Sequence, residues 1–211
     1  MTEPAENNNA TDDLLEQFLH FDALGLKKES KQAVLAIIDI VHSLDAKVAW
    51  TQNNLDRLQW NRRSRIRHEF YEAIIFLALK ADFDRGDPEA SYLLGKYAQN
   101  LYSSPSLHAQ IGQRSAMDFF RIAFQSAPSC VRYRRAYLCS LLNGLQYAFH
   151  EWPSGILIDH TNWHSELREL REQLSVASSL DSDDEFAATL AEWFENTEQY
   201  ERRLATQPTV R

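Results

Sequence analysis

The sequence predicts an all-α protein built from stacked helical hairpins. Glycine and proline are scarce, with six of each among 211 residues, which disfavours a β-rich fold with many tight turns. Apolar residues recur every three or four positions along most of the chain, as they do on the buried face of a helix. One pattern occurs twice, because the segment that begins at Ala81 is matched 46 residues later by the segment that begins at Ala127. A period of this length is typical of paired helices that stack on one another.

At the N-terminus, the sequence predicts a polar tail followed by a helix. Residues 1–10 are rich in asparagine and are expected to be disordered. A helix is expected over residues 12–24, because Thr11 can cap its first turn and Gly25 can end it. Ser30 is the next candidate for an N-cap.

A heptad pattern follows. Apolar residues recur with a period of seven from Val34 to Leu58, and only Thr51 interrupts them, which predicts one long helix over residues 34–58. The pattern favours a hairpin within the chain, because charged pairs at the flanking positions are sparse. A homodimer seam along the same helix stays open as the alternative.

The remaining helices are predicted from their apolar stripes and from the turn residues between them. Gly86-Asp-Pro88 ends one helix and begins the next, and Pro88 suits a first helical turn, where a missing N–H costs nothing. A last helix is expected to open with the capping box Ser182-Asp-Asp-Glu185. The expected helices span residues 62–83, 88–103, 111–127, 129–149 and 161–178, followed by the helix that opens at Ser182.

Together these elements predict one helical domain over residues 11–204. Within it we expect an N-terminal hairpin over 11–60, a repeat-like stack over 62–150 and acidic helices over 156–204. No strand-like alternation competes with these patterns.

The middle of the chain resembles a SEL-one-like repeat, a relative of the tetratricopeptide repeat. The resemblance covers residues 70–140 and is carried by small residues, aromatic residues and the turn between two helices. These residues are Ala73, Ala78, Ala81, Gly86-Asp-Pro-Glu-Ala90, Leu94-Gly95, Tyr97, Ala116, Phe119, Phe120, Ala123 and Ala127. The resemblance implies a short right-handed array of helical hairpins with capping helices, a groove that binds a protein or peptide, and no catalytic residues. Small residues at a crossing point bring helices close together.

This interpretation places partner-binding residues on the first helix of each expected pair. They combine aromatic, amide and basic side chains, and they are Tyr92, Lys96, Gln99, Asn100, Arg132 and Arg135.

Charge is distributed unevenly along the chain. Residues 1–51 carry a net charge of −5, residues 52–135 carry +5 and residues 136–211 carry −8. The basic middle contains a cluster of arginines that suits phosphate or acidic side chains. Its candidate anion-binding residues are Arg62, Arg63, Arg65 and Arg67. The alternative is that this cluster pairs with acidic helices of the same chain. A nucleic-acid-associated regulator that uses residues 57–67 and 132–135 stays open, although the overall charge of −8 opposes it.

Arg63-Ser-Arg-Ile-Arg-His68 also resembles the Arg-x(4–6)-His motif of HEPN-type ribonucleases. In that family the arginine stabilises phosphate charge and the histidine acts as acid or base. The resemblance implies a second alternative, a ribonuclease that uses Arg63 and His68.

Other features point away from catalysis and from membranes. The longest apolar run, over positions 73–79, has seven residues, where a bilayer span needs about 20. The N-terminus lacks the basic and apolar regions of a signal peptide, and the two cysteines indicate no disulfide framework, so a cytoplasmic protein is expected. His160 and His164 share a helix face but lack a third ligand, so neither a metal nor a cofactor is expected. The sequence thus predicts a non-catalytic cytoplasmic adaptor or regulatory protein that holds a partner in a helical groove.

Overall fold

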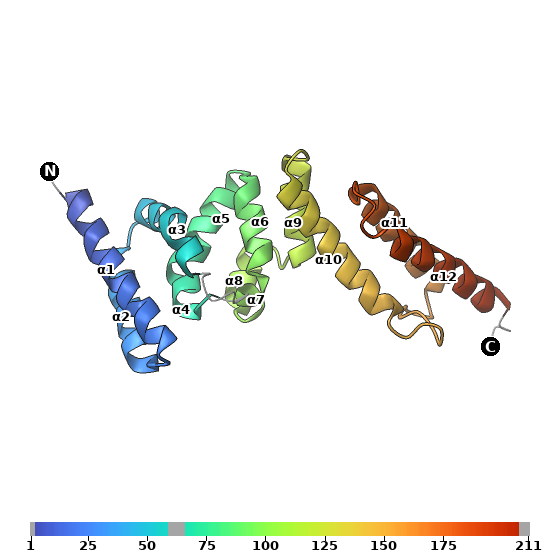
Figure 1. Cartoon of the computed structure of the whole chain (residues 1–211), viewed down its shortest axis with the longest axis horizontal. Helices are drawn as coiled ribbons and strands as arrows, with labels where there is room; N and C mark the ends of the chain where they lie inside the picture. Colours follow the sequence, from blue (N-terminus) through green and yellow to red (C-terminus); the bar gives the residue numbers. More distant parts are fainter. Residues whose placement is uncertain (1–2, 59–65, 207–211) are drawn as a thin grey trace. The chain divides into compact units, whose positions relative to one another are not determined.

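The computed structural model describes residues 3–58 and 66–206, and these residues form helices, turns and loops without any strand. The all-α class is thereby confirmed. The chain divides into two compact units, unit 1 (Met1–Ser126) and unit 2 (Ala127–Arg211) (Figure 1). The sequence instead predicts one domain over residues 11–204.

Unit 1 contains the helices that were expected to form the N-terminal hairpin and most of the repeat-like stack. In chain order they are α1 (Glu3–Ala23), α2 (Lys27–Ile40), α3 (Leu44–Leu58), α4 (His68–Phe70), the π-helix η1 (Tyr71–Ile75), α5 (Phe76–Asp84), α6 (Pro88–Lys96), α7 (Ala98–Tyr102), α8 (Pro105–Gln110) and α9 (Ala116–Ser126).

Helices α1 and α2 form a hairpin through a turn at Gly25. Gly25 has a φ of +72°, and its N–H donates to the Asp22 carbonyl while the Leu26 N–H donates to that of Phe21. This is the Schellman arrangement, which glycine adopts without a steric penalty. The predicted helix end at Gly25 is therefore confirmed. Helix α1 nevertheless begins at Glu3, within the segment that was expected to be disordered.

The predicted long helix over residues 34–58 is wrong, because the chain leaves the helical conformation between α2 and α3. Val41 has φ −90° and ψ 66°, and the Ser43 hydroxyl accepts a hydrogen bond from the Ala46 N–H at 3.2 Å. Ser43 therefore caps a new helix. Val41 stays 4% exposed although it is not helical, which shows that packing in the core outweighs the helical period here. The residues of the heptad pattern that are buried thus pack within unit 1.

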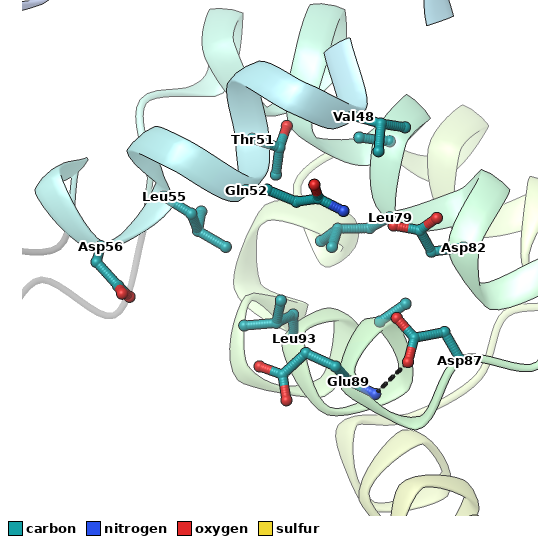
Figure 2. A pocket seen from close by; sticks show the side chains of 12 residues that line it. Val48, Thr51, Gln52, Leu55, Asp56, Leu79, Asp82, Asp87, Glu89 and Leu93 are labelled. Carbon is teal, nitrogen blue, oxygen red and sulfur yellow. Dashed lines mark hydrogen bonds between the residues drawn. The ribbon is translucent and has the colours of Figure 1, made fainter. Parts of the chain in front are cut away.

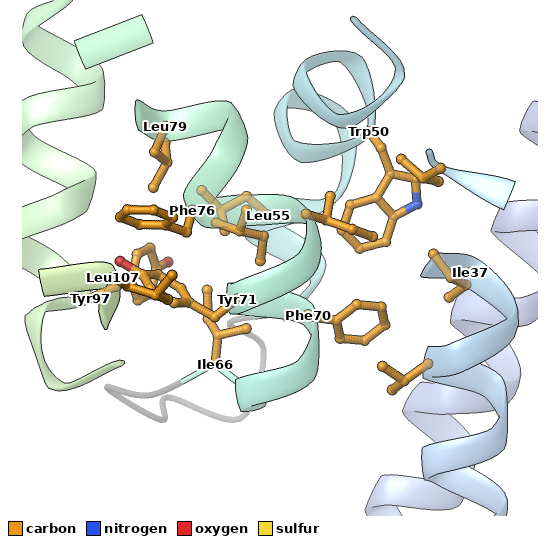
Figure 3. Packing of buried hydrophobic residues seen from close by; sticks show 14 of the residues in the cluster. Ile37, Trp50, Leu55, Ile66, Phe70, Tyr71, Phe76, Leu79, Tyr97 and Leu107 are labelled. Carbon is orange, nitrogen blue, oxygen red and sulfur yellow. The ribbon is translucent and has the colours of Figure 1, made fainter. Parts of the chain in front are cut away.

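The continuous helical segment formed by α4, η1 and α5 is buried on more than one side. Phe70 lies toward Ile37 and Trp50, whereas Tyr71 and Phe76 lie toward Tyr97 (Figure 3). A π-helix inserts one extra residue into the turn, which changes the face presented by the residues that follow. This segment is therefore the centre of the hydrophobic core of unit 1.

Helices α6 and α9 cross closely at Gly95. A Cβ atom at this position would lie 2.8 Å from Phe120 Cε1 and 3.1 Å from the Ala116 carbonyl oxygen. Only a residue without a side chain allows this approach. The expected helix over 88–103 is divided at Tyr97, whose φ of −103° and ψ of 22° end α6, and the short helix α8 lies between the expected helices over 88–103 and 111–127.

We expect Gly95→Ala to lower the free energy of unfolding of unit 1 by about 1–3 kcal/mol, because the new methyl group overpacks the crossing. Gly144→Ala, in unit 2, is the control for the effect of alanine within a helix, since Gly144 also lies inside a helix but a Cβ there meets no atom within 4 Å. The control should gain about 0.5–1 kcal/mol from helix propensity. Urea titrations followed by circular dichroism measure both changes, and a gain in stability for both variants would contradict the close crossing.

Unit 2 consists of α10 (Val131–Phe149), α11 (Trp163–Leu180) and α12 (Ala187–Thr206). Helix α10 was assigned to the repeat-like stack, but its contacts place it with the C-terminal helices, because it packs on α11. The Phe149 ring also stacks on Trp193 of α12 with a centroid distance of 5.4 Å. The predicted capping box is replaced by Asp181, whose carboxylate accepts hydrogen bonds from the N–H groups of Glu185 and Phe186 at 3.1 and 2.8 Å.

Candidate functional site

Residues of α3, α5 and α6 in unit 1 line an open pocket with a volume of about 230 Å³ (Figure 2). Its floor is apolar and its edge is acidic. The floor consists of Val48, Leu55, Ala78, Leu79, Ala90 and Leu93, and the acidic side chains are Asp56, Asp82, Asp87 and Glu89. Thr51 and Gln52 complete the lining.

Three of the four carboxylates, those of Asp82, Asp87 and Glu89, lie close to the turn between α5 and α6 in the sequence. Gly86 has a φ of +83°, and the Asp87 N–H donates to the Asp82 carbonyl across the turn at 3.1 Å. The Asp87 carboxylate then accepts from the Glu89 N–H at 3.1 Å and caps α6, with Pro88 in the first turn. Gly86-Asp-Pro88 thus ends one helix and starts the next, as the sequence predicted. The same turn concentrates negative charge at one end of the pocket.

The charged side chains that line the pocket are all carboxylates. Asp82 forms an ion pair with Arg85, which does not line the pocket. Among the lining residues that the structure describes, none is lysine, arginine or histidine. Burial raises the pKa of the Tyr97 hydroxyl above its ordinary value, and the negative charge of Asp56 raises it further.

Thr51 supplies a polar group within the apolar part of the lining. It is 4% exposed, and its hydroxyl has no hydrogen-bond partner among the residues that the structure describes. A buried hydroxyl without a partner costs about 1–3 kcal/mol. Such a group in a pocket wall is a reason to look for a ligand that would satisfy it.

The four candidate partner-binding residues of unit 1 do not line this pocket. The Tyr92 ring packs against Phe120 at a centroid distance of 5.9 Å. The Lys96 ammonium lies 5.6 Å from the centre of the Tyr97 ring, and Gln99 is exposed.

Asn100 lies in the core rather than on a groove, since it is 0% exposed. Its Oδ1 accepts from the Ile66 N–H at 3.1 Å, and its Nδ2 donates to the Ile66 carbonyl at 2.7 Å. The expectation that Asn100 contacts a partner is thereby corrected. Helix periodicity placed it beside Lys96 and Gln99, but the break at Tyr97 turns α7 away from the line of α6.

The other two candidates, Arg132 and Arg135, belong to unit 2. Arg132 lies with its guanidinium 5.3 Å from the centre of the Tyr133 ring. Arg135 Nη2 donates to both carboxylate oxygens of Glu185, at 3.2 and 2.8 Å. The six candidates are thus divided between the two units.

Three of the four candidate anion-binding residues, Arg62, Arg63 and Arg65, lie outside the described residues. The fourth, Arg67, makes contacts inside unit 1, because its Nη1 donates to the Ser30 hydroxyl at 2.8 Å and its Nε to Glu69 at 3.2 Å. Ser30 is buried within α2 and is therefore not the N-cap that was expected.

Arg57 also pairs within the chain. Its guanidinium contacts Asp12 and Glu16 of α1 at 2.8 and 2.6 Å. Burial lowers the pKa of Arg57, but the hydrogen bonds to Glu16 and Asp12 outweigh burial and raise it above the ordinary value. The structure thus shows Arg57 and Arg67 paired with acidic residues of the same chain.

The ribonuclease alternative depends on Arg63 and His68. Arg63 is outside the described residues, so the geometry of the pair stays untested. His68 Nε2 lies 3.2 Å from the Glu72 carboxylate, and its Nδ1 is buried without a hydrogen-bond partner among the described residues.

No family model, curated protein or solved structure matches this chain. None of the described helices combines the length and hydrophobicity needed to cross a bilayer. Within residues 3–58 and 66–206, no group of three His, Cys, Asp or Glu side chains is arranged to hold a metal ion.

The acidic edge of the pocket is not among the features predicted from the sequence. Three of its four carboxylates fall within residues 81–90, where the sequence predicts the end of one helix, a turn and the start of the next helix. Counting charge over residues 52–135, which sum to +5, hid this local excess of acid. A count over ten-residue windows would have found it.

Proposed function

We propose that this protein is a non-catalytic adaptor that binds a segment of a partner protein in the α3–α5–α6 pocket. The observation that carries this proposal is an apolar floor, including Leu55, Leu79 and Leu93, that three helices leave open at the surface. An apolar side chain of a partner that covers this floor releases water, which is the main favourable contribution to such binding.

The packing of α6 on α9 supports the same proposal. Gly95 allows the close helix crossing that the SEL-one-like resemblance implies, and repeats of this type present grooves between helices. The acidic edge opposes a nucleic-acid partner at this pocket, because phosphates carry the same charge as the carboxylates. A reducing, cytoplasmic location is part of the proposal, and it is supported by Cys130 and Cys139, which are both free thiols.

Photo-crosslinking tests the proposal. We expect benzoylphenylalanine introduced at Gln52, in the pocket wall, to crosslink a defined partner protein in a lysate of the native host. The same group at Leu35, which is 46% exposed on α2, is the matched control and should not crosslink that protein. Mass spectrometry of the adduct identifies the segment that occupies the pocket.

A second variant distinguishes a partner bound in the pocket from a protein that is crosslinked at a neighbouring surface. Leu93→Lys places a longer side chain on the pocket floor, with an ammonium group that can pair with the acidic edge, and it should reduce crosslinking from position 52 by at least about tenfold because it occupies the space of the partner. Circular dichroism must show an unchanged helix content for this comparison. Equal crosslinking with and without Leu93→Lys, or the same partner captured from position 35, would contradict the proposed site.

A further inference from the structure

We infer that the segment bound in the α3–α5–α6 pocket presents a cationic side chain, arginine or lysine, next to an apolar residue. The inference rests on the proposed function and specifies the chemistry of the partner. Its basis is the arrangement of carboxylates around the apolar floor.

The carboxylates flank the floor from different sides. Figure 2 shows Asp56 on one side of the pocket and Asp82 and Asp87 on the other, and Leu79 and Leu93 lie between them. An arginine or lysine has an aliphatic stem that packs on apolar surface and a charged head that stays near water or carboxylates. The alternation of acid, leucine and acid across the pocket matches both parts of such a side chain.

The size of the pocket also suits a side chain. Pockets that hold drug-sized molecules have volumes of about 300–1,000 Å³, whereas this one has a volume of about 230 Å³. It therefore suits one or two side chains of a partner better than a large cofactor.

Thr51 provides an observation that is independent of charge. Thr51 is one of the lining residues, and its buried hydroxyl lacks a partner among the described residues. A hydroxyl both donates and accepts hydrogen bonds, so it can accept from a guanidinium or ammonium group or donate to a backbone carbonyl of the partner segment. Either bond would remove the cost of the unsatisfied group.

The test uses two dipeptides that differ in charge alone. Acetyl-leucyl-arginine amide carries the proposed cation, and acetyl-leucyl-citrulline amide replaces the guanidinium by a neutral group of nearly the same shape. Acetyl-leucyl-lysine amide distinguishes arginine from lysine. Each is titrated into the full-length protein while the methyl resonances of Leu55, Ala78 and Ala90 are recorded by NMR, because these methyl groups line the pocket.

We expect the arginine or lysine dipeptide to shift these methyl resonances with an affinity at least about fivefold higher than that of the citrulline dipeptide. Glu89→Gln should weaken binding of the cationic dipeptide by up to about fivefold and leave binding of the citrulline dipeptide unchanged. Asp13→Asn, an exposed acid on α1, is the matched control and should change neither affinity.

The outcomes separate this inference from the proposed function. Equal affinity for the charged and neutral dipeptides, or shifts confined to methyl groups outside the pocket, overturns the cationic preference. If position 52 still crosslinks a partner in that case, the adaptor proposal stands without it. If position 52 crosslinks nothing and no dipeptide shifts the pocket resonances, both fail.

Discussion

Phe70→Ala is expected to lower the free energy of unfolding of unit 1 by about 3–5 kcal/mol. Phe70 is 0% exposed, its ring stacks on Trp50 at a centroid distance of 5.3 Å, and it meets Phe18 edge to face at 5.0 Å. Truncation removes the apolar contacts that join α1, α3 and α4, and it leaves a cavity that these helices cannot fill without moving. Total stabilities of domains are about 5–15 kcal/mol, so this loss is a large share.

Hydrogen–deuterium exchange at increasing urea concentrations, followed in peptides from residues 66–126, measures this loss within unit 1. Phe70→Leu keeps most of the volume and should lose only about 1–1.5 kcal/mol. Leu35→Ala, at an exposed position of α2, should change the free energy by less than about 0.5 kcal/mol. A loss below 1 kcal/mol for Phe70→Ala would contradict the central position of this ring.

Asn100→Ala is expected to lower the free energy of unfolding by about 2–4 kcal/mol, because two buried backbone groups of Ile66 lose their partner. Each unsatisfied group costs about 1–3 kcal/mol. The same variant should increase the exchange rate of the Ile66 amide hydrogen, which NMR measures directly. If Asn100 instead contacted a partner, as the sequence suggested, the variant would weaken binding and leave the free energy of unfolding unchanged.

Asn100→Asp provides the matched comparison. The introduced carboxylate keeps the acceptor for the Ile66 N–H, but it loses the donor to the Ile66 carbonyl and places a charge at a site with no exposure. We expect a loss at neutral pH at least as large as that for alanine. The loss should shrink as the pH falls, because the protonated carboxyl group regains a donor. A pH-independent loss would indicate that the hydrogen bond to the carbonyl contributes little.

The turn residues show how far local chemistry can be predicted. Gly25 and Gly86 both end helices in the left-handed conformation, and Pro88 starts the helix after Asp87, as their types require. These preferences act over a few neighbouring residues and do not depend on distant contacts.

The break between α2 and α3 shows where such prediction ends. The heptad residues from Val34 to Leu58 support one helix by periodicity, yet Val41 leaves the helical conformation and remains buried. Nothing in the local pattern distinguishes a long helix from two shorter ones that pack the same apolar residues against different neighbours. The competing contacts lie on α1, α4 and α5, far away in the sequence.

The amino-acid sequence alone determined that this chain is helical, where several of its helices end, and that its acidic and basic residues are unevenly distributed, because these properties depend on composition and on near neighbours. Tertiary structure alone decided that Asn100 and Arg67 make contacts within unit 1 and that Leu55, Leu79 and Leu93 face an acid-lined pocket. The physical reason is that burial and charge environment are set by residues from separate helices. Those helices become neighbours only when the chain folds.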